Sequence, residues 1–315
     1  MIQGTLLSAN VGCFHPKGKN FTYSLFDPSL ASMIGRKIQK EKDDICLIQE
    51  AWTFVDALFP RDFDEYEVLG LNDMIAVRKE FGYFEPGTYK CYSKRFIDPK
   101  TGLINHRGEG AYHGSTNPSE FGIPADFDVS SVIINVKQNR IQNNRQDEME
   151  PRNATKEQNG TQNAEKILVV NVHVTSAPWN DERRAYEIRE WIMKDAIAMA
   201  NEKCGGNILI AGDFNEDETR NPKSKSSQAI LELLNLPNMR DASNHSNEST
   251  TNYPIIKRKL DHMMGTAQFS DFRIEQPLLI EDIKLFKKKH KLSWMYIDHR
   301  SITAKFHFES QKAQK

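Results

Sequence analysis

The stretch Asn207-Ile208-Leu209-Ile210-Ala211-Gly212-Asp213-Phe214-Asn215 decides the fold of this chain. Its first half is a short apolar run, which is typical of a buried strand. Gly212 interrupts the run and lets the backbone turn tightly. Asp213 and Asn215 are two residues apart, so at a strand end their side chains point to one side. Such oxygens suit a hard cation such as Mg²⁺ or a phosphate ester with its attacking water, although an Asp/Asn turn is also common there.

Other segments of the chain repeat this pattern of an apolar strand next to a reactive polar group. Residues 4–11, 45–48, 167–172, 259–264 and 302–308 read as strands from their apolar runs or alternation. The polar residues at or beside their termini are Asn10, Glu50, His173, Asp261, Asp298 and His299. Each of these residues alone is more often structural than functional. Their recurrence indicates one shared site for metal and proton chemistry.

Composition and charge exclude several classes of protein. The chain has 315 residues with 42 Lys and Arg against 43 Asp and Glu, so its net charge is -1 and no global basic field indicates nucleic acid. Its 4 cysteines are far apart, which favours buried free thiols over a disulfide framework or zinc site. No apolar run is long enough to span a bilayer. The first residues lack a signal peptide, which predicts a cytoplasmic protein, but a mature secreted form would look the same.

Helices are expected on the outside of the strands. Asp27-Pro28 begins one helix with a capping side chain and a proline in the first turn. Asn180-Asp181 begins a second, which ends at Gly205-Gly206, and residues 226–236 form a third. Residues 138–165 are poor in large apolar groups, so we expect a disordered insertion within a single domain spanning 1–310.

Polar segments between the predicted strands have alternative interpretations. The loop 103–114 is rich in glycine and cationic groups, and Arg107 is its candidate phosphate-binding residue; a flexible hairpin is the alternative that we favour. The run 284–291 is strongly basic and is most simply a solvated loop, but beside an active site it would attract phosphates. Residues 12–20 read as a polar loop.

Six motifs together resemble the endonuclease/exonuclease/phosphatase superfamily, whose members include pancreatic deoxyribonuclease, abasic-site endonucleases, neutral and bacterial sphingomyelinases and inositol polyphosphate 5-phosphatases. The motifs stand in the family's order across residues 6–308, nearly the whole chain. They are Ser-Ala-Asn10, Ile-Gln-Glu50, the His173 strand, Gly-Asp213-Phe-Asn215, Leu-Asp261 and Asp298-His299. The resemblance implies an α/β fold, a four-layered sandwich of two packed, mainly antiparallel β-sheets flanked by helices (deoxyribonuclease I-like), with the cleft at one end.

The resemblance also implies a role for each matching residue. Glu50 would be the main Mg²⁺ ligand, with Asn10 and Asp298 near the metal; Mn²⁺ and Ca²⁺ are alternatives. Asp213 and Asn215 would orient or activate the attacking water and hold the phosphate, and Asn10 would also contact substrate. His299 would be a general base or phosphate ligand oriented by Asp261, and His173 a second phosphate ligand or acid. Where the family often has an aromatic residue after the strand aspartate, this chain has His262, which should face away because it neighbours a strand residue.

The resemblance implies hydrolysis of a phosphodiester but leaves the substrate open. His173, the following Ser176-Ala177-Pro178 and the basic run 284–291 slightly favour a nuclease. His173 again, the Asn105-His106-Arg107-Gly108 loop and the near-neutral charge fit a sphingomyelinase-like phospholipase C, although no membrane-docking hairpin or helix is evident. A phosphomonoesterase and a catalytically inert binding module are further alternatives. The expected partner is a phosphodiester substrate, nucleic acid or phospholipid head group, bound by a monomer.

Overall fold

The computed structural model describes most of the predicted strands and the helices that cover them. It describes the backbone but not the side chains of residues 14–17, 20–23, 28–31, 94–97 and 111–114. The described residues are 1–11, 14–17, 20–23, 28–51, 58–59, 64–70, 73–92, 94–97, 111–114, 129–137, 165–174, 181–243, 248–251, 258–276, 284, 288 and 299–309.

The first large sheet contains the N-terminal and C-terminal strands side by side. Its strand order is β16-β17-β1-β4-β6-β5. Its strands are β1 (Ile2–Asn10), β4 (Ile45–Gln49), β5 (Tyr66–Leu69), β6 (Met74–Arg78), β16 (Gln268–Glu275) and β17 (Ser301–Phe308). Only β1 and β4 are parallel, and helix α1 (Pro28–Glu41) lies between them in the chain. This parallel pair brings the ends of β1 and β4, and so Asn10 and Glu50, to one edge of the sheet.

The second large sheet carries the other half of the strand-end residues. Its order is β14-β15-β13-β12-β11-β7, and β8 also pairs with β11. Its strands are β7 (Gly82–Phe84), β8 (Lys90–Tyr92), β11 (Val129–Val136), β12 (Lys166–His173), β13 (Ile208–Asp213), β14 (Arg240–Asp241) and β15 (Asp261–Gly265). The central pair β12 and β13 is parallel, with His173 opposite Asp213. All other pairs in this sheet are antiparallel.

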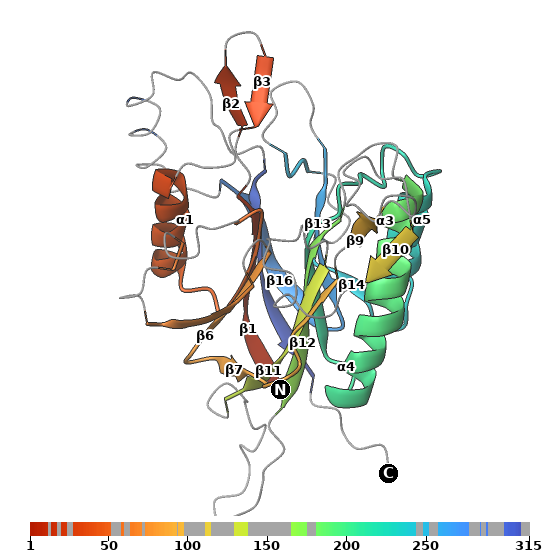
Figure 1. The fold of residues 1–315 in the computed structure, drawn as a ribbon. Coiled ribbons are helices and arrows are strands. Elements are labelled where there is room, and N and C mark those ends of the chain that lie inside the picture. The colour runs from red at the N-terminus through yellow and green to blue at the C-terminus, as the bar shows by residue number, and fades with distance from the viewer. Residues whose placement is uncertain are drawn as a thin grey trace, which may run out of the picture.

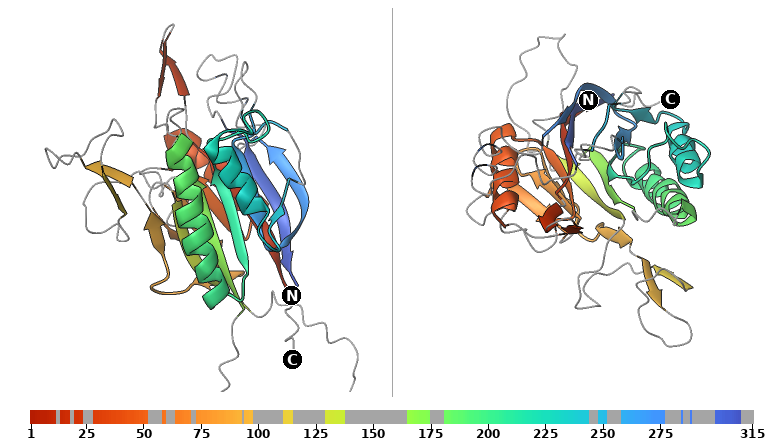
Figure 2. Two further views of the ribbon diagram at one scale, coloured as in Figure 1. Left: turned by 90° about the vertical axis from the view of Figure 1, so that its right-hand side faces the viewer. Right: turned by 90° about the horizontal axis from the view of Figure 1, so that it is seen from above.

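Three apolar clusters hold four layers together, which confirms the predicted α/β sandwich. One cluster fills the space between the two sheets and includes Leu6, Leu47, Val169 and Leu209. A second packs the outer face of the second sheet against the helices, and a third packs α1 on the outer face of the first sheet. Figure 1 and the view from above in Figure 2 show α1 on one side of the paired sheets and α3, α4 and α5 on the other.

The helix predicted to begin at Asp181 is continuous but changes its winding. It runs through α3 (Asp181–Tyr186), the π-helical segment η4 (Glu187–Ala196) and α4 (Ile197–Lys203). The predicted core face is buried throughout, at Ala185, Ile188, Ile192, Ala196 and Met199. Ile188, Ile192 and Ala196 are four residues apart, a spacing wider than the 3.6-residue α-helical turn. The wider turn of a π-helix keeps residues at this spacing on the face that packs against the sheet. The sequence pattern alone did not reveal the π-helical segment. The third helix, α5, spans Lys225–Leu234.

Several local predictions have a defined outcome. The polar loop expected at residues 12–20 is wrong in part, because β2 (Phe14–Lys17) pairs antiparallel with β3 (Asn20–Tyr23) and the polar residues lie in paired strands. Strand β9 (Lys94–Ile97) pairs with β10 (Ala111–Gly114), while Arg107 lies outside the described residues. Cys46, Cys91 and Cys204 are buried free thiols, as expected.

Other predictions fall outside the described residues. Residues 138–164 and most of the basic run are among them, so the insertion and the single-domain division stay predictions. Within the described ranges, no helix combines the length and apolar character that a membrane crossing needs.

A buried polar bridge joins the two sheets directly beneath the strand ends. Gln49 of β4 donates from Nε2 to Oδ1 of Asn171 on β12 at 2.6 Å. Asn171 donates from Nδ2 to the carbonyl oxygens of Ile48 and Met74, at 3.1 Å and 3.0 Å. Because these polar groups are fully buried, sliding one sheet over the other would leave them unpaired. The bridge therefore fixes how Glu50 on one sheet faces His173 and Asp213 on the other.

Candidate active site

Strand pairing places the predicted site residues at one end of the sandwich. On the second sheet Asp213 is the register partner of both His173, across the parallel pair, and Asp261, across the antiparallel pair. On the first sheet Asn10 ends β1, and Glu50 directly follows β4. His299 lies two residues before β17, which pairs with β1. Residues far apart in the sequence thus meet because each adjoins an end of a neighbouring strand.

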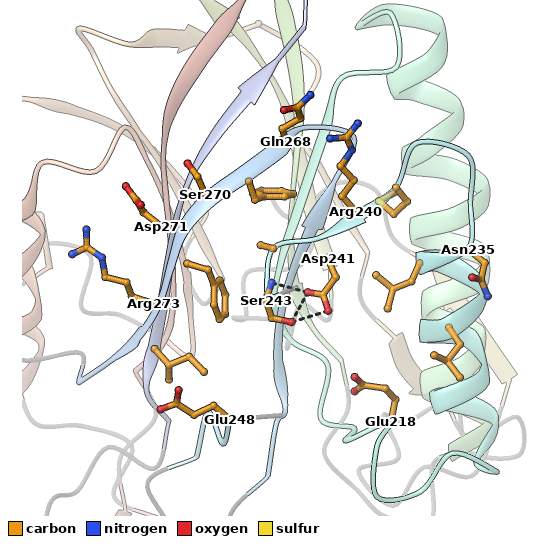
Figure 3. A pocket seen from close by; sticks show the side chains of 17 residues that line it. Glu218, Asn235, Arg240, Asp241, Ser243, Glu248, Gln268, Ser270, Asp271 and Arg273 are labelled. Atoms are coloured by element: carbon orange, nitrogen blue, oxygen red, sulfur yellow. Dashed lines mark hydrogen bonds between the residues drawn. The ribbon is translucent and has the colours of Figure 1, made fainter. Parts of the chain in front are cut away.

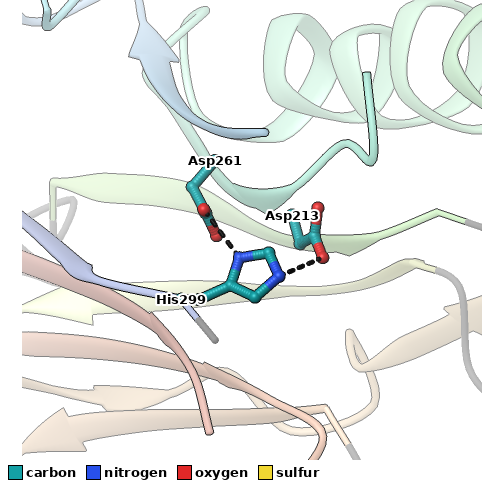
Figure 4. Close-up of side chains that lie close together, drawn as sticks. All are labelled: Asp213, Asp261 and His299. Atoms are coloured by element: carbon teal, nitrogen blue, oxygen red, sulfur yellow. Dashed lines mark hydrogen bonds and ion pairs between the residues drawn. The ribbon is translucent and has the colours of Figure 1, made fainter. Parts of the chain in front are cut away.

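Three buried side chains form the centre of this cluster (Figure 4). Nδ1 of His299 lies 2.8 Å from Oδ2 of Asp261. Nε2, on the other side of the ring, lies 3.6 Å from Oδ2 of Asp213. An Nδ1–H donated to Asp261 sets the tautomer in which Nε2 accepts a proton. The arrangement is a histidine oriented by one carboxylate and aimed at another.

Asn10 connects this centre to Glu50 across the gap between the sheets. Its Nδ2 donates to Oδ2 of Asp213 at 3.1 Å and to Oε1 of Glu50 at 3.2 Å. Asn10 is buried, so both hydrogen bonds are shielded from water. One amide group therefore sets the separation of two carboxylates that belong to different sheets.

A second histidine–carboxylate pair flanks Glu50, and sequence reasoning missed its acidic member. Nε2 of His173 lies 3.4 Å from Oε1 of Glu50, and Nδ1 lies 3.3 Å from Oδ1 of Asp73. The contact with Asp73 is an ion-pair distance without hydrogen-bond alignment. Asp73 also accepts a hydrogen bond from the backbone N–H of Glu50 at 3.3 Å. Asp73 directly precedes buried strand β6, just as His299 stands shortly before β17, so the same pattern of a polar residue at a strand start could have indicated it.

The backbone is strained at two of these residues. Glu50 and Asn215 have φ values of 56° and 51°, in the left-handed region. That conformation costs an ordinary residue roughly 1–2 kcal/mol, less for asparagine. Asn215 is held by its N–H, which donates to Oδ1 of Asp213 at 2.7 Å, and by its Nδ2, which donates to the carbonyl oxygen of Val174 at 2.8 Å. Strain that the surroundings enforce in this way is characteristic of functional sites.

Burial and charge shift the ionisation of these groups in opposite directions. Burial raises the pKa of Asp213 to about 6, although the nearby His299 opposes the shift. Burial alone would raise the pKa of Glu50, but hydrogen bonds from His173 and Asn10 hold this pKa below the ordinary value. Burial alone would lower the pKa of His173, but the carboxylates of Asp73 and Glu50 outweigh it and hold that pKa well above the ordinary value. Burial raises the pKa of Asp73.

Comparison with known proteins identifies the family. The model of the endonuclease/exonuclease/phosphatase family matches residues 7–282, most of the chain. The chain belongs to the endonuclease/exonuclease/phosphatase family. Members of this family are phosphoric ester hydrolases. No curated protein matches the chain.

Solved structures share the fold of this family member at low sequence identity. An endonuclease/exonuclease/phosphatase from Bacteroides vulgatus is 14% identical, covers 98% of this chain and 100% of its own, and has a TM-score of 0.56. D. rerio TDP2 complexed with a single-strand DNA product is 15% identical, with 97% and 99% covered and a TM-score of 0.53. Truncated Caenorhabditis elegans TDP2 is 13% identical, with 97% and 98% covered and the same TM-score of 0.53. At these identities the likeness shows the fold.

The donor atoms at the site fit the hard divalent cation on which this family generally depends. Glu50 offers a partly exposed carboxylate, with a side chain that is 21% accessible, beside Asn10. Asp213, Asp261 and His299 each present a ligand atom within 4.8 Å of the others. However, the ring nitrogens of His299 face Asp261 and Asp213, which makes that trio better suited to proton transfer. Oxygen donors around Glu50 are the ligands that Mg²⁺ and Ca²⁺ prefer.

Most of the site residues predicted from the sequence lie together in the structure, and two are not among the described residues. Asp298 and Arg107 are not among the described residues, so their roles stay predictions. The residues that meet are Asn10, Glu50, His173, Asp213, Asn215, Asp261 and His299. His262 faces away from them, as expected: its Nε2 lies 3.2 Å from the carbonyl oxygen of Glu216 and its ring packs edge-on against Phe214.

A cavity of about 1050 Å³ lies elsewhere, between α5, β14 and β16 (Figure 3). Its walls include Leu231, Arg240, Asp241, Phe272 and Arg273. None of the residues that meet at the strand ends lines it. This cavity and the strand-end cluster are therefore separate, and we take the cluster as the candidate active site because it holds the histidine–carboxylate pairs.

Proposed function

We propose that this chain is a divalent-metal-dependent phosphodiester hydrolase with Mg²⁺ as its metal and a nucleic-acid strand as its favoured substrate. The observation that carries the proposal is the pairing of His299 with Asp261 and of His173 with Asp73, on either side of Asn10. His299, oriented by its hydrogen bond to Asp261, would supply proton transfer, and His173, flanked by two carboxylates, would supply a positive charge for binding the anion. Family membership supports the hydrolytic reaction itself.

Glu50 is the residue that would chiefly hold the metal, with Asn10 and Asp298 beside it. When bound, the metal would neutralise a nonbridging phosphate oxygen and stabilise the leaving alkoxide. Glu50 is suited to this role because its carboxylate is kept ionised by hydrogen bonds and is more accessible than the carboxylates of Asp213 and Asp261. Mn²⁺ and Ca²⁺ are alternatives that bind the same kind of ligand.

His299 takes the proton of the attacking water. Its Nδ1 is held by Asp261, which stabilises the imidazolium that forms at Nε2. Asp213 and Asn215 orient the water and the phosphate, since both lie at the turn that follows β13. The general-base effect contributes on the order of 10²–10⁴ in rate. Asp213 is the alternative base, because it is buried beside Nε2.

His173 binds the phosphate or protonates the leaving oxygen. It lies between the carboxylates of Glu50 and Asp73, which stabilise its positively charged form. The nucleic-acid preference is supported by Ser176-Ala177-Pro178 after His173 and by the basic run 284–291. It is also supported by D. rerio TDP2, which shares the fold and is complexed with a single-strand DNA product.

A parallel hydrolysis assay tests this proposal. Plasmid DNA, RNA and sphingomyelin vesicles are each incubated with the protein in Mg²⁺ and in EDTA, with Glu50→Ala as the blank. We expect EDTA-sensitive cleavage of nucleic acid by the wild-type chain and none by the variant. Phosphocholine release from vesicles would show that the substrate is a phospholipid and not a nucleic acid. Equal turnover of any substrate in EDTA would overturn the metal-dependent mechanism, and inactivity on all three would overturn the nucleic-acid assignment.

A further inference from the structure

Glu216, one residue beyond Asn215, is buried in a network that the proposed reaction does not use. Only 6% of the residue is exposed. Its Oε2 accepts hydrogen bonds from Nη2 of Arg184 at 2.9 Å and from Oγ of Ser226 at 2.7 Å. Its Oε1 accepts from Oγ of Ser227 at 3.2 Å. A buried carboxylate that faces donor groups on three side chains, one of them a guanidinium, has one well-defined position.

The partners of Glu216 belong to the segments that bear the other site residues. Arg184 is in α3, the helix that follows β12 and His173. Ser226 and Ser227 lie in the first turn of α5, and Oγ of Ser226 also lies 2.5 Å from Oδ1 of Asp181 in α3, so its single proton bonds one of the two carboxylates at a time. The carboxylate of Glu216 therefore fastens the turn after β13 to the outer helices.

The backbone of Glu216 makes a contact toward a third strand. Its carbonyl oxygen lies 3.2 Å from Nε2 of His262, the residue next to Asp261 on β15. Since His262 and Asp261 alternate across the strand, this contact fixes the face on which Asp261 meets His299. Glu216 therefore contacts α3, which follows β12, through its side chain, and β15 through its backbone. It also belongs to the turn that follows β13.

Asn215 stands between two anchors. Its left-handed backbone is held on one side by Asp213, through the hydrogen bond from its N–H, and is followed on the other by the immobilised Glu216. A strained conformation persists only where the surroundings over-determine it. With Glu216 released, we expect the turn to relax toward a less strained backbone and to shift Asn215 from the position that the proposed function gives it beside the phosphate.

We infer that Glu216 is a positioning residue, which holds Asn215 and Asp213 in their reactive arrangement by fastening the turn after β13 to Arg184, Ser226 and Ser227. The inference rests on the proposed function, because Asn215 and Asp213 are the groups that it positions. It goes beyond that function, since the carboxylate of Glu216 is buried against Arg184, Ser226 and Ser227 and would act only through the residues that it positions. The outer helices would thereby hold the residues at the end of β13 in position.

The test compares Glu216→Gln with a matched buried carboxylate. Glu187 is completely buried and accepts from Nε of Arg183 at 2.7 Å, on the same helix as Arg184. Each glutamine keeps the side-chain size but turns one acceptor into a donor that faces a guanidinium or hydroxyl. Both variants should lose thermal stability. Only Glu216→Gln should lower kcat, by at least tenfold with KM changed less than threefold, when each protein is assayed well below its own melting temperature.

Two further measurements keep the inference separable from folding and from the proposed reaction. If Glu216→Gln does not fold, the double variant Ser226→Ala/Ser227→Ala, which leaves the Arg184 pair in place, should lower kcat by several-fold. If the wild-type protein hydrolyses none of the substrates, the proposed function fails, and the NMR shift of the Asn215 amide decides the inference: it should move in Glu216→Gln and stay in Glu187→Gln. Wild-type kcat in folded Glu216→Gln, equal losses in both variants, or an unmoved amide would each overturn it.

Discussion

The ring of His173 lies 3.3 Å, measured from Nδ1, from a carboxylate oxygen of Asp73, whose side chain is completely buried. This pair mirrors His299 and Asp261 on the other side of Asn10. Each histidine is also close to a second acid, Glu50 or Asp213, that belongs to the reactive cluster. Under the proposed function, His299 would accept the proton of the attacking water, while Asp73 and Glu50 stabilise the protonated form of His173.

Asp73→Asn should lower turnover about 100-fold or more while leaving the protein folded, because it removes the buried charge that stabilises protonated His173. The measurement is kcat under saturating substrate and metal. Asp43→Asn is a control with another buried acid, which precedes β4 while Glu50 follows it, and it should keep wild-type kcat. Equal kcat in Asp73→Asn and wild type would remove His173 from the mechanism.

Asp261 and His299 should behave as one catalytic unit. We expect Asp261→Asn and His299→Ala each to reduce kcat by on the order of 10²–10⁴, because the histidine loses either its orientation or its ring. The double variant should be no slower than His299→Ala alone, since groups that act together are non-additive. Steady-state kinetics of the three variants checks this. Multiplicative losses would show that the two residues act separately.

Gly212→Ala should destabilise the protein by more than about 3 kcal/mol. An added Cβ would lie 1.9 Å from the carbonyl oxygen of Val172, within the parallel pair of β12 and β13, and φ at this glycine is 145°. Gly87→Ala is the matched control, with a φ of 74° and no atom within 4 Å of the added carbon. It should cost only the left-handed strain, roughly 1–2 kcal/mol. Urea unfolding compares the two; similar losses would mean that strand contact at Gly212 can relax.

Glu50→Gly should be more stable than Glu50→Ala by about 1 kcal/mol, although neither should hydrolyse substrate. Both remove the carboxylate, but only alanine keeps a Cβ at a φ of 56°. Glycine relieves that strain, which raises the free energy of unfolding. Part of this increase is lost because glycine also makes the unfolded chain more flexible. Thermal unfolding in EDTA measures the difference without bound metal. Equal stability would indicate that the turn after β4 relaxes when its side chain is removed.

Asp43→Asn should stabilise the protein above pH 6. Burial raises the pKa of Asp43 from 3.8 to about 6, and Glu41 adds to the shift. Because the folded form binds the proton more tightly, the wild-type chain loses stability as pH rises from 4 to 6. The variant lacks this loss and should gain roughly 1–3 kcal/mol at pH 7, with no gain below pH 4. Unfolding curves across that range test it; a gain that is constant with pH would point to packing instead.

Sequence reasoning identified the strands that bear the site but missed several others. Apolar runs such as residues 45–48 and 167–172 are recognisable because both of their faces are buried. The edge strand β16 escaped notice because it is mostly half-buried or exposed and its register shifts between Ser270 and Arg273. Residues on such a strand show no clean alternation, so their pairing depends on neighbours distant in the chain.

The sequence by itself determined the layered sandwich, the family and the residue types at the strand ends, because strand periodicity and short motifs are local properties. Only the tertiary structure decided how these ends meet: that Asn10 links Glu50 to Asp213, that Asp73 supports His173, and that Glu216 fastens the turn of Asn215. The physical reason is that such contacts depend on sheet register and on the packing of one sheet against the other. Both are set by buried pairs such as Gln49 with Asn171, which lie 122 residues apart in the chain.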